Sequence, residues 1–323
     1  MIVPGTPRVV GLGVATLDYL FLSPAAAPGG QAGLREYAIE GGGLIATAVV
    51  TAARLGAATE LRTWIGDDDA GEAVVAGLRA EGVDTSRVEV IPGERTAVAF
   101  IHVEEGTGER TIYFAGCPQV TPAQQARMAQ GPRECDAVVV DSVWPEASAA
   151  LAWRARERGT PVVGDFCPEG DLIALAGLMT ALIVPRAGAE RLVPLASRSS
   201  ARGGPRGTPG ASWEDRLRVL AHTGAEFVAI TAGAEGCHFL EAGNACHQPA
   251  FSVPVVDTTG AGDVFHGAFA YALARQWSVA QGMEFASAVA ALSCRALGGR
   301  KAIPSYQEAA EFLRERGSGR WEW

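Results

Sequence analysis

The hydrophobic positions fall into short runs that are apolar on both faces, separated by longer alanine-rich stretches. Such runs suit the strands of a parallel sheet that is covered on both sides, and the alanine-rich stretches suit the covering helices. The pattern therefore predicts an α/β core, with a mostly parallel sheet between two helical layers. The predicted strands are 8–14, 137–143, 161–166, 181–185 and 226–233, and the predicted helices include 43–55, 70–81 and 147–158.

Two segments, 21–40 and 95–116, interrupt this alternation, and with the flanking residues they give a predicted lid of about 14–38 and 95–116. The second has alternating apolar and polar residues on both sides of residues 105–108 (EGTG), which predicts a solvated β-hairpin. We expect the two segments to form a small β lid beside the main sheet. A thin exposed sheet has edges and an apolar face that need cover, so the lid also favours a homodimer.

Composition narrows the class of protein and its partners. With 323 residues, 48% of them hydrophobic and 20% charged, the chain has the size and balance of one enzyme domain, 1–323. The net charge of −9 argues against nucleic acid as a partner, and no stretch approaches the roughly 20 apolar residues of a membrane span. We therefore expect a cytoplasmic enzyme whose scattered cysteines stay reduced. The stretch 196–212 lacks apolar periodicity, which predicts a mobile surface loop.

The turn within residues 256–273 carries the clearest chemistry. An apolar strand end passes through a glycine-containing turn into an alanine-rich helix, which we expect to begin near Gly262 or Asp263. Gly260 and Gly262 let the backbone approach an anion, and the amides from Ala261 to Asp263 can bind it at the positive end of the helix dipole. Asp263, beside this anion hole, can take the proton of a hydroxyl that attacks a phosphoryl group. The alternative is that Asp263 only caps the helix.

The same turn resembles a known signature. The run DTTGAGDVFHGAF is similar to the C-terminal signature of the ribokinase/PfkB carbohydrate kinases, and 41–56 with 65–71 is similar to their N-terminal signature. The resemblance extends along almost the whole chain. It implies a three-layer ribokinase-like sandwich and an ATP-dependent kinase, in which Asp263 is the general base and residues 260–262 form the anion hole. ATP would be accompanied by Mg²⁺, and the nucleophile would be a hydroxyl of a small sugar.

The resemblance also implies which residues bind the two substrates. Asp18 would grip sugar hydroxyls, since an ionised carboxylate accepts two such donors; its alternative is a capping or turn role. Thr47 stands where many relatives have an asparagine, which leaves the identity of the sugar open. For Ser287, simple helix packing is an equal alternative. The remaining sugar-binding residues are Gly42 and Gly43, and the nucleotide-binding residues are Thr231, Gly233, Gly236 and Ser287.

The resemblance leaves the magnesium ligands incomplete. The family often carries an Asn-x-x-Glu motif that organises magnesium and phosphates, but the matching stretch, 185–188, lacks both side chains. Glu190 could partly substitute and Arg186 could contact a phosphate, or both could be solvated surface charges. Magnesium is therefore expected to be bound by ATP.

A monovalent-cation loop is also implied. Asp257 and Thr259 match positions of that loop in many relatives. The run GGRKAIP, interpreted as a strand end, places Lys301 close to the loop. This leads to the hypothesis that the Lys301 ammonium replaces a potassium ion; the alternative is that it points into solvent.

Within the family the chain looks most like the ketohexokinase and sulfofructose-kinase branch, which favours a ketose or related sugar. A charged sugar would need a fixed arginine, and the strand end 141–144 has none, so we expect an uncharged sugar unless Arg110 or an arginine from a partner's lid intervenes. Phe114 is expected to face the substrate, where it and Trp144 could stack on a sugar or simply pack. A nucleoside kinase and a non-catalytic nucleotide or sugar sensor are the alternative functions.

Overall fold

The computed structural model describes most of the chain, and its strands form two β-sheets. Outside the described residues lie Cys167, the tip of the predicted hairpin at 107–109, and the predicted loop 196–212 apart from Ser212. The described residues are 5–24, 31, 33–106, 110–130, 134–166, 172–190 and 212–318.

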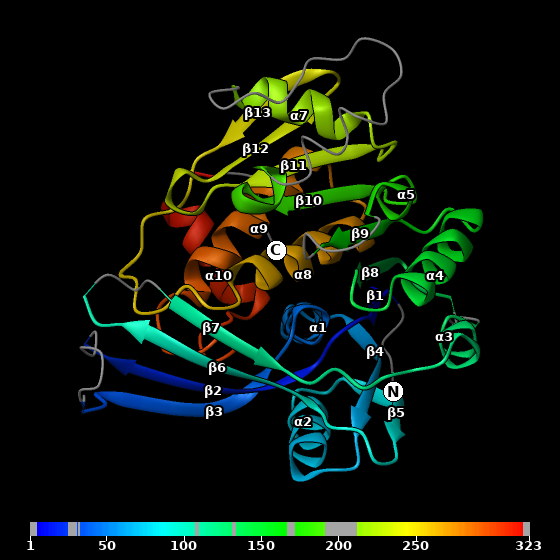
Figure 1. Ribbon diagram of the computed structural model, residues 1–323. Coiled ribbons are helices and arrows are strands. Elements are labelled where there is room, and N and C mark those ends of the chain that lie inside the picture. The colour runs from blue at the N-terminus through cyan, green and yellow to red at the C-terminus, as the bar shows by residue number, and fades with distance from the viewer. Residues whose placement is uncertain are drawn as a thin grey trace.

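A nine-stranded sheet forms the centre of the molecule (Figure 1). Its strands are β1 (Arg8–Leu12), β4 (Ala58–Gly66), β5 (Asp84–Ile91), β8 (Ala137–Asp141), β9 (Val162–Asp165), β10 (Ala181–Pro185), β11 (Phe227–Thr231), β12 (Cys237–Glu241) and β13 (Asn244–Gln248). They lie in the order β13-β12-β11-β10-β9-β8-β1-β4-β5. Every neighbouring pair from β11 to β5 is parallel, and β12 and β13 add an antiparallel hairpin at one edge. The predicted mostly parallel sheet is confirmed.

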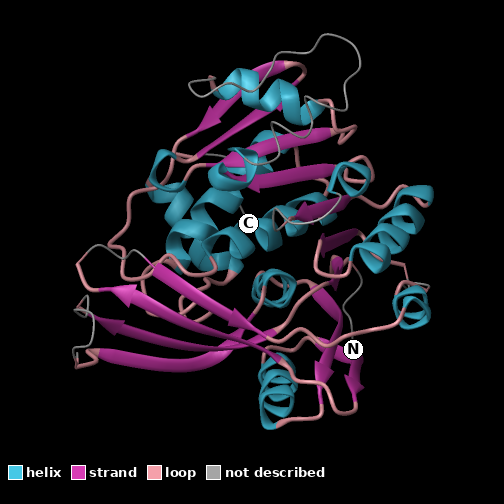
Figure 2. Cartoon of the chain, in the orientation of Figure 1, coloured by secondary structure: helices cyan, strands magenta, loops and turns pink. Residues whose placement is uncertain are grey.

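Helices cover both faces of this sheet (Figure 2). One layer holds α1 (Leu44–Arg54), α2 (Asp69–Ala80), α8 (Ala261–Ala274), α9 (Val279–Ser293) and α10 (Tyr306–Glu315), and the other holds α3 (Pro122–Met128), α4 (Pro145–Glu157), α5 (Leu172–Ala176) and α7 (Trp213–Ala221). Alternate strand residues point to opposite faces. Accordingly, Val139 and Ile183 pack in the core under α1 and α8, whereas their neighbours Val138 and Leu182 pack under α4 and α7. The predicted three layers are confirmed.

The sequence pattern does not predict β4 or β5, and β4 shows the reason. This strand is buried, but it carries Glu60 and Arg62 inside, where Arg62 Nε donates to Glu60 Oε1 at 2.7 Å. The pair interrupts the apolar run that marks a covered strand, although each charge satisfies its partner. A buried ion pair therefore hides this covered strand from hydrophobic patterning.

A second, four-stranded sheet projects beside the first, at the lower left of Figure 1. Its strands are β2 (Thr16–Ser23), β3 (Glu36–Gly42), β6 (Ala97–Glu104) and β7 (Arg110–Ala115). They lie in the order β3-β2-β6-β7, and β6 and β7 form the predicted antiparallel hairpin. Leu20, Ile101 and Val103 on one face pack with Leu297 of the body. The expected small β lid is therefore present.

Two predictions about chemistry concern the described residues as a whole. Among the helices in this part of the chain, none is long and apolar enough to cross a membrane. The cysteines described there are free thiols, as expected: Cys117, Cys135, Cys237, Cys246 and Cys294.

Candidate active site

A cavity of about 690 Å³ lies where the carboxyl ends of the parallel strands meet the lid. Open α/β sheets commonly bind ligands at this edge. Several parts of the chain line the cavity, which brings distant segments together at one place. They include Ser142 and Thr231 at the ends of β8 and β11, Asp18 and Phe114 from the lid, Thr47 from α1, and Gly262 and Asp263 from the start of α8.

Helix α8 begins at a glycine in the left-handed conformation. Gly260 is the N-cap with φ 70°, and a Cβ there would lie 3.0 Å from a neighbouring backbone segment. The helix starts at Ala261, slightly earlier than predicted, and Asp263 is therefore not its cap. The Ala261 amide donates to the Thr258 carbonyl at 3.3 Å. The predicted anion hole thus depends mainly on the amides of Gly262 and Asp263, which have no acceptor within the helix.

Asp263 lies in the first turn of α8 and lines the cavity. Burial raises its pKa well above the usual carboxyl range, and the carboxylates of Asp165 and Asp18 raise it further. Arg110 and Arg300 lower the pKa in partial compensation. A raised pKa makes the ionised carboxylate a stronger base, as the deprotonation of a hydroxyl requires.

Two polar side chains beside Asp263 were not singled out by the sequence. Asp165, at the end of β9, lines the cavity at 5% exposure, and its carboxylate raises the pKa of Asp263. Its Oδ2 lies 3.3 Å from Nδ1 of His266, whose ring nitrogens also face the carbonyls of Gly262 and Ile183 at 2.7 and 2.9 Å. Asp165 and His266 therefore form the buried polar surroundings of Asp263.

Asp18 and Gly42 meet at the lid end of the cavity. Thr16 Oγ1 donates to Asp18 Oδ1 at 2.5 Å. Burial raises the pKa of Asp18, whereas this hydrogen bond and the nearby Arg300 lower it. A Cβ on Gly42 would collide with the Asp18 carboxylate. The glycine therefore makes room for the carboxylate at the predicted sugar site.

Gly43 and Thr47 belong to the start of α1. Gly43 has φ 90°, and a Cβ there would lie 2.6 Å from the Val14 carbonyl, so a side chain is excluded. Thr47, one turn later, lines the cavity and accepts a hydrogen bond from Arg300 Nε at 3.2 Å. Arg300 is buried and was missed by the sequence interpretation, which considered only its neighbour Lys301.

The predicted nucleotide-binding residues lie around β11, β12 and α9, but only Thr231 lines the cavity. Gly233 opens a short 3-10 turn, and Gly236 has φ 93°, where a Cβ would collide with the carbonyl of Gln248. Ser287 is 8% exposed and its Oγ lies 3.9 Å from the Cys237 sulfur. These contacts fit the packing alternative for Ser287, and its role toward a nucleotide stays a prediction.

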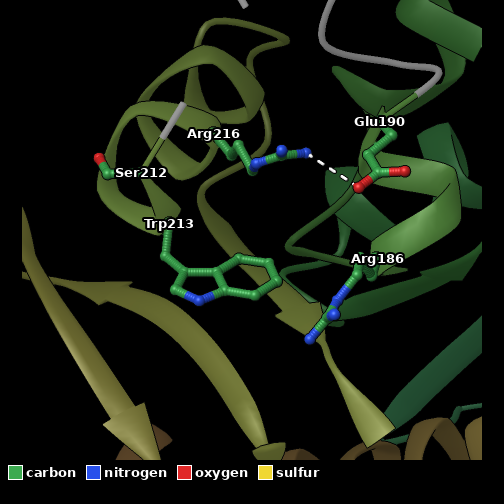
Figure 3. A pocket seen from close by; sticks show the side chains of 5 residues that line it. All are labelled: Arg186, Glu190, Ser212, Trp213 and Arg216. Atoms are coloured by element: carbon green, nitrogen blue, oxygen red, sulfur yellow. Dashed lines mark ion pairs between the residues drawn. The ribbon is translucent and has the colours of Figure 1, made fainter. Parts of the chain in front are cut away.

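Arg186 and Glu190 line a second, smaller cavity of about 210 Å³ (Figure 3). Glu190 lies 3.5 Å from Arg216, and the Arg186 guanidinium lies 5.0 Å from the centre of the Trp213 ring. Arg186 also pairs with Glu235 at 2.5 Å. Within the described residues, no group of three His, Cys, Asp or Glu side chains is arranged to hold a metal ion. The proposed substitutes for the magnesium motif thus remain a prediction.

The predicted monovalent-cation loop is stabilised by its own backbone. Asp257 Oδ1 accepts from the Thr259 amide at 2.8 Å, and Oδ2 accepts from the Gly298 amide at 2.9 Å. Lys301 does not reach this loop, because its ammonium pairs with Glu36 of β3 at 3.2 Å on the surface. The hypothesis that Lys301 replaces potassium is therefore wrong, and GGRKAIP forms turns rather than a strand end.

The structure shows which of the aromatic and basic candidate residues line the cavity. Phe114 is 54% exposed and lines the cavity, whereas Trp144 is 5% exposed and packs edge-on against Trp64, 4.9 Å between ring centres. Arg110 also lines the cavity, and its Nη1 donates to Thr258 Oγ1 at 2.7 Å. Among the described lining residues it is the one lysine or arginine, so the cavity does contain a cationic side chain.

The family described as pfkB family carbohydrate kinase matches residues 18–305. The chain belongs to this family. This carbohydrate kinase is 30% identical over 315 residues to a ribokinase of Haemophilus influenzae, a match that covers 94% of this chain and 97% of the relative. It is also 27% identical to the ATP-dependent ribose-1-phosphate kinase of Halopiger xanaduensis, over 89% of this chain and 91% of that protein.

Solved structures confirm the ribokinase-like fold of the kinase. A protein of Agrobacterium tumefaciens, 30% identical, matches with a TM-score of 0.81 over 97% of this chain and 99% of its own. The Arabidopsis thaliana ribokinase complexed with ribose and ATP, 21% identical, matches with a TM-score of 0.78 over 96% and 99% of the two chains. The ketohexokinase and sulfofructose-kinase branch stays a prediction.

Proposed function

We propose that this carbohydrate kinase transfers the terminal phosphoryl group of ATP to a hydroxyl of a small sugar. One observation supports this most: a single cavity is lined by the carboxylate of Asp263, the first turn of α8 and the carboxylate of Asp18. Asp263 accepts the hydroxyl proton as the new O–P bond forms, and the backbone amides of Gly262 and Asp263, in the turn that follows Gly260, bind the transferring phosphoryl oxygens. ADP leaves with the electrons of the broken bond.

The nucleotide and ions follow from the same geometry. Thr231, at the carboxyl end of β11, supports a phosphate site beside the α8 turn. Because the described residues hold no cluster of metal ligands, Mg²⁺ enters the site with ATP. Thr259 Oγ1 is buried and has no hydrogen-bond partner in the described part of the chain, which supports a monovalent cation beside Asp257.

The sugar is a ketose or a related carbohydrate, and an uncharged one is favoured by the apolar wall that Ile112, Phe114 and Val143 provide. Ribose joins the ketoses as a first sugar to test, because the Haemophilus influenzae relative is named a ribokinase. Arg110 supports a second candidate, a sugar phosphate, since a guanidinium in the cavity can bind a phosphate group.

A coupled assay of ADP release over a panel of ketoses, ribose, sugar phosphates and nucleosides tests this function. We expect ADP release that depends on one class of sugar and is lost in Asp263→Asn. Binding of sugar or nucleotide without any turnover would instead identify a sensor, and a preference for nucleosides would contradict the sugar assignment.

The lid is proposed to form a homodimer of these single kinase domains. Its outer face exposes Tyr37, Phe100 and Tyr113 at 70%, 46% and 64%. Cross-strand pairing places Phe100 beside Tyr113 and Tyr19, so these rings form one continuous apolar face. A large apolar patch of this kind marks a contact surface. Light scattering that gives the mass of a monomer would contradict the dimer.

A further inference from the structure

Arg300 is a buried charge to which the proposed phosphoryl transfer assigns no task. It lies in the turn between α9 and α10 and is 5% exposed. Its Nε donates to Thr47 Oγ1 at 3.2 Å, its Nη2 donates to the Gly42 carbonyl at 2.7 Å, and its backbone amide donates to Glu40 Oε1 at 3.2 Å. A guanidinium removed from water needs such partners, and its planar fork holds them in a fixed geometry.

The partners of Arg300 lie at the lid end of the cavity, where we propose that the sugar binds and which we call the sugar end. Thr47 and Gly42 line the cavity, whereas Arg300 does not, so the guanidinium contacts this site from behind. Among the described residues, Arg300 is the one group that hydrogen-bonds Thr47 Oγ1. A hydroxyl has one proton and two lone pairs. Because Arg300 donates to a lone pair, the Thr47 proton is left for an acceptor on the ligand.

We propose that Arg300 is a positioning residue that determines which groups of the sugar site donate hydrogen bonds to the ligand and which accept them. Thr47 is the donor and Asp18 is the acceptor. The matching ligand presents an acceptor oxygen to Thr47 and one or two hydroxyls to Asp18. This inference rests on the proposed sugar-kinase function and deepens it. It defines the recognition pattern of the sugar, which the position of Asp263 does not.

The charges around Asp18 support the same role. Burial raises the pKa of Asp18, and the Thr16 hydrogen bond and the charge of Arg300 lower it. The other charged groups that face it are Glu40 on β3 and Asp263 on α8, whose pKa values Asp18 itself raises. Burial lowers the pKa of Arg300 to about 10, so it stays charged at neutral pH. Loss of this charge would therefore raise the pKa of Asp18, so that Asp18 would become protonated at a higher pH.

The test compares four variants by steady-state kinetics and thermal unfolding: Arg300→Lys, Arg300→Met, Thr47→Val and the double variant Arg300→Lys/Thr47→Val. Lys301→Met, which changes the neighbouring surface cation, is the control. Arg300→Lys keeps the charge but not the fork, and Thr47→Val keeps the shape but not the hydroxyl. Arg300→Lys and Thr47→Val should each raise the sugar KM about tenfold, which is the effect of losing one hydrogen bond to a polar ligand. Both should leave the ATP KM unchanged.

The double variant and the pH profile separate positioning from simple structural support. The sugar KM of the double variant should equal that of Thr47→Val alone, because Arg300→Lys acts through the missing hydroxyl. In Arg300→Met, the acidic limb of kcat/KM for the sugar should move to higher pH, because the charge of Arg300 lowers the pKa of both Asp18 and Asp263. If Arg300→Met does not fold, the other three variants still decide the question.

Three results would overturn this inference. They are a wild-type sugar KM in folded Arg300→Lys, fully additive effects in the double variant, or an unshifted acidic limb in folded Arg300→Met. A wild-type enzyme that phosphorylates none of the sugars would overturn the proposed function as well, so the two failures are distinguishable.

Discussion

The two ends of the active-site cavity are built in different ways. At the phosphate end, the proposed base and anion hole come from one continuous segment, in which the turn at Gly260 leads directly into the helix that carries Asp263. The sugar end is assembled from Asp18 on β2, the junction of β3 with α1, and the distant turn that carries Arg300. We therefore propose that the catalytic step depends chiefly on local backbone geometry, whereas recognition of the sugar depends on tertiary packing between separate segments.

The largest effect should come from the phosphate end. Asp263→Asn keeps the shape of the side chain but removes the base, so kcat should fall by roughly 10³-fold while the fold stays intact. ADP release measures the rate, and thermal unfolding checks the fold. Retention of the wild-type kcat would contradict the role of Asp263 and would remove the distinction between the two ends.

A change at the sugar end should affect binding more than rate. In Gly42→Ala the new Cβ collides with the Asp18 carboxylate, so we expect the sugar KM to rise about tenfold, with the ATP KM unchanged. Gly77→Ala is the matched control, because a Cβ at that position in α2 meets nothing within 4 Å. Equal kinetics for the two alanine variants would show that Asp18 does not need the space at Gly42.

The pH profile links the two ends through their carboxylates. Asp263 has a raised pKa and acts as a base only when ionised, so kcat/KM should fall as the pH drops through that raised value, above the range of an ordinary carboxyl. Asp165→Asn removes a carboxylate that raises the pKa of Asp263, so the acidic limb should move to lower pH. A limb that stays fixed would exclude this electrostatic connection.

Substitutions on the exposed face of the lid test whether the sugar end depends on a second subunit. Tyr37→Glu combined with Tyr113→Glu places charges on the exposed apolar face, so the proposed dimer should dissociate at assay concentrations. Light scattering measures the mass, and we expect the sugar KM to change severalfold at most if each lid closes over its own cavity. A complete loss of activity in a folded monomer would show that the partner's lid completes the site.

The smallest effect should come from Lys301, next to Arg300. Lys301→Met removes an exposed pair with Glu36 and should change stability by less than about 1 kcal/mol, with unchanged kinetics and an unchanged response to potassium. Thermal unfolding and activity in potassium and in lithium salts check this. A potassium dependence that appears only in Lys301→Met would restore a role for Lys301 in the cation loop.

The same contrast explains what the sequence could predict. Some features are encoded by residues close together in the chain, so patterns and spacing indicate them directly. They are the strands that are apolar on both faces, the β6–β7 hairpin and the turn before Asp263. Strand β4 was missed because Glu60 and Arg62 neutralise each other inside the fold. Arg300 was missed because only packing decides that it points inward while Lys301 points outward. Local chemistry was therefore predictable, and the partners of the sugar site were not.

The central claim is tested most directly by the stoichiometry of the reaction. Purified enzyme is incubated with ATP, magnesium and the best sugar of the panel, and both ADP and phosphorylated sugar are quantified by mass spectrometry. The account predicts one phosphorylated sugar for each ADP, and roughly 10³-fold slower formation of both products with Asp263→Asn. ADP formed without a phosphorylated sugar, or equal product from the Asp263→Asn variant, would contradict it.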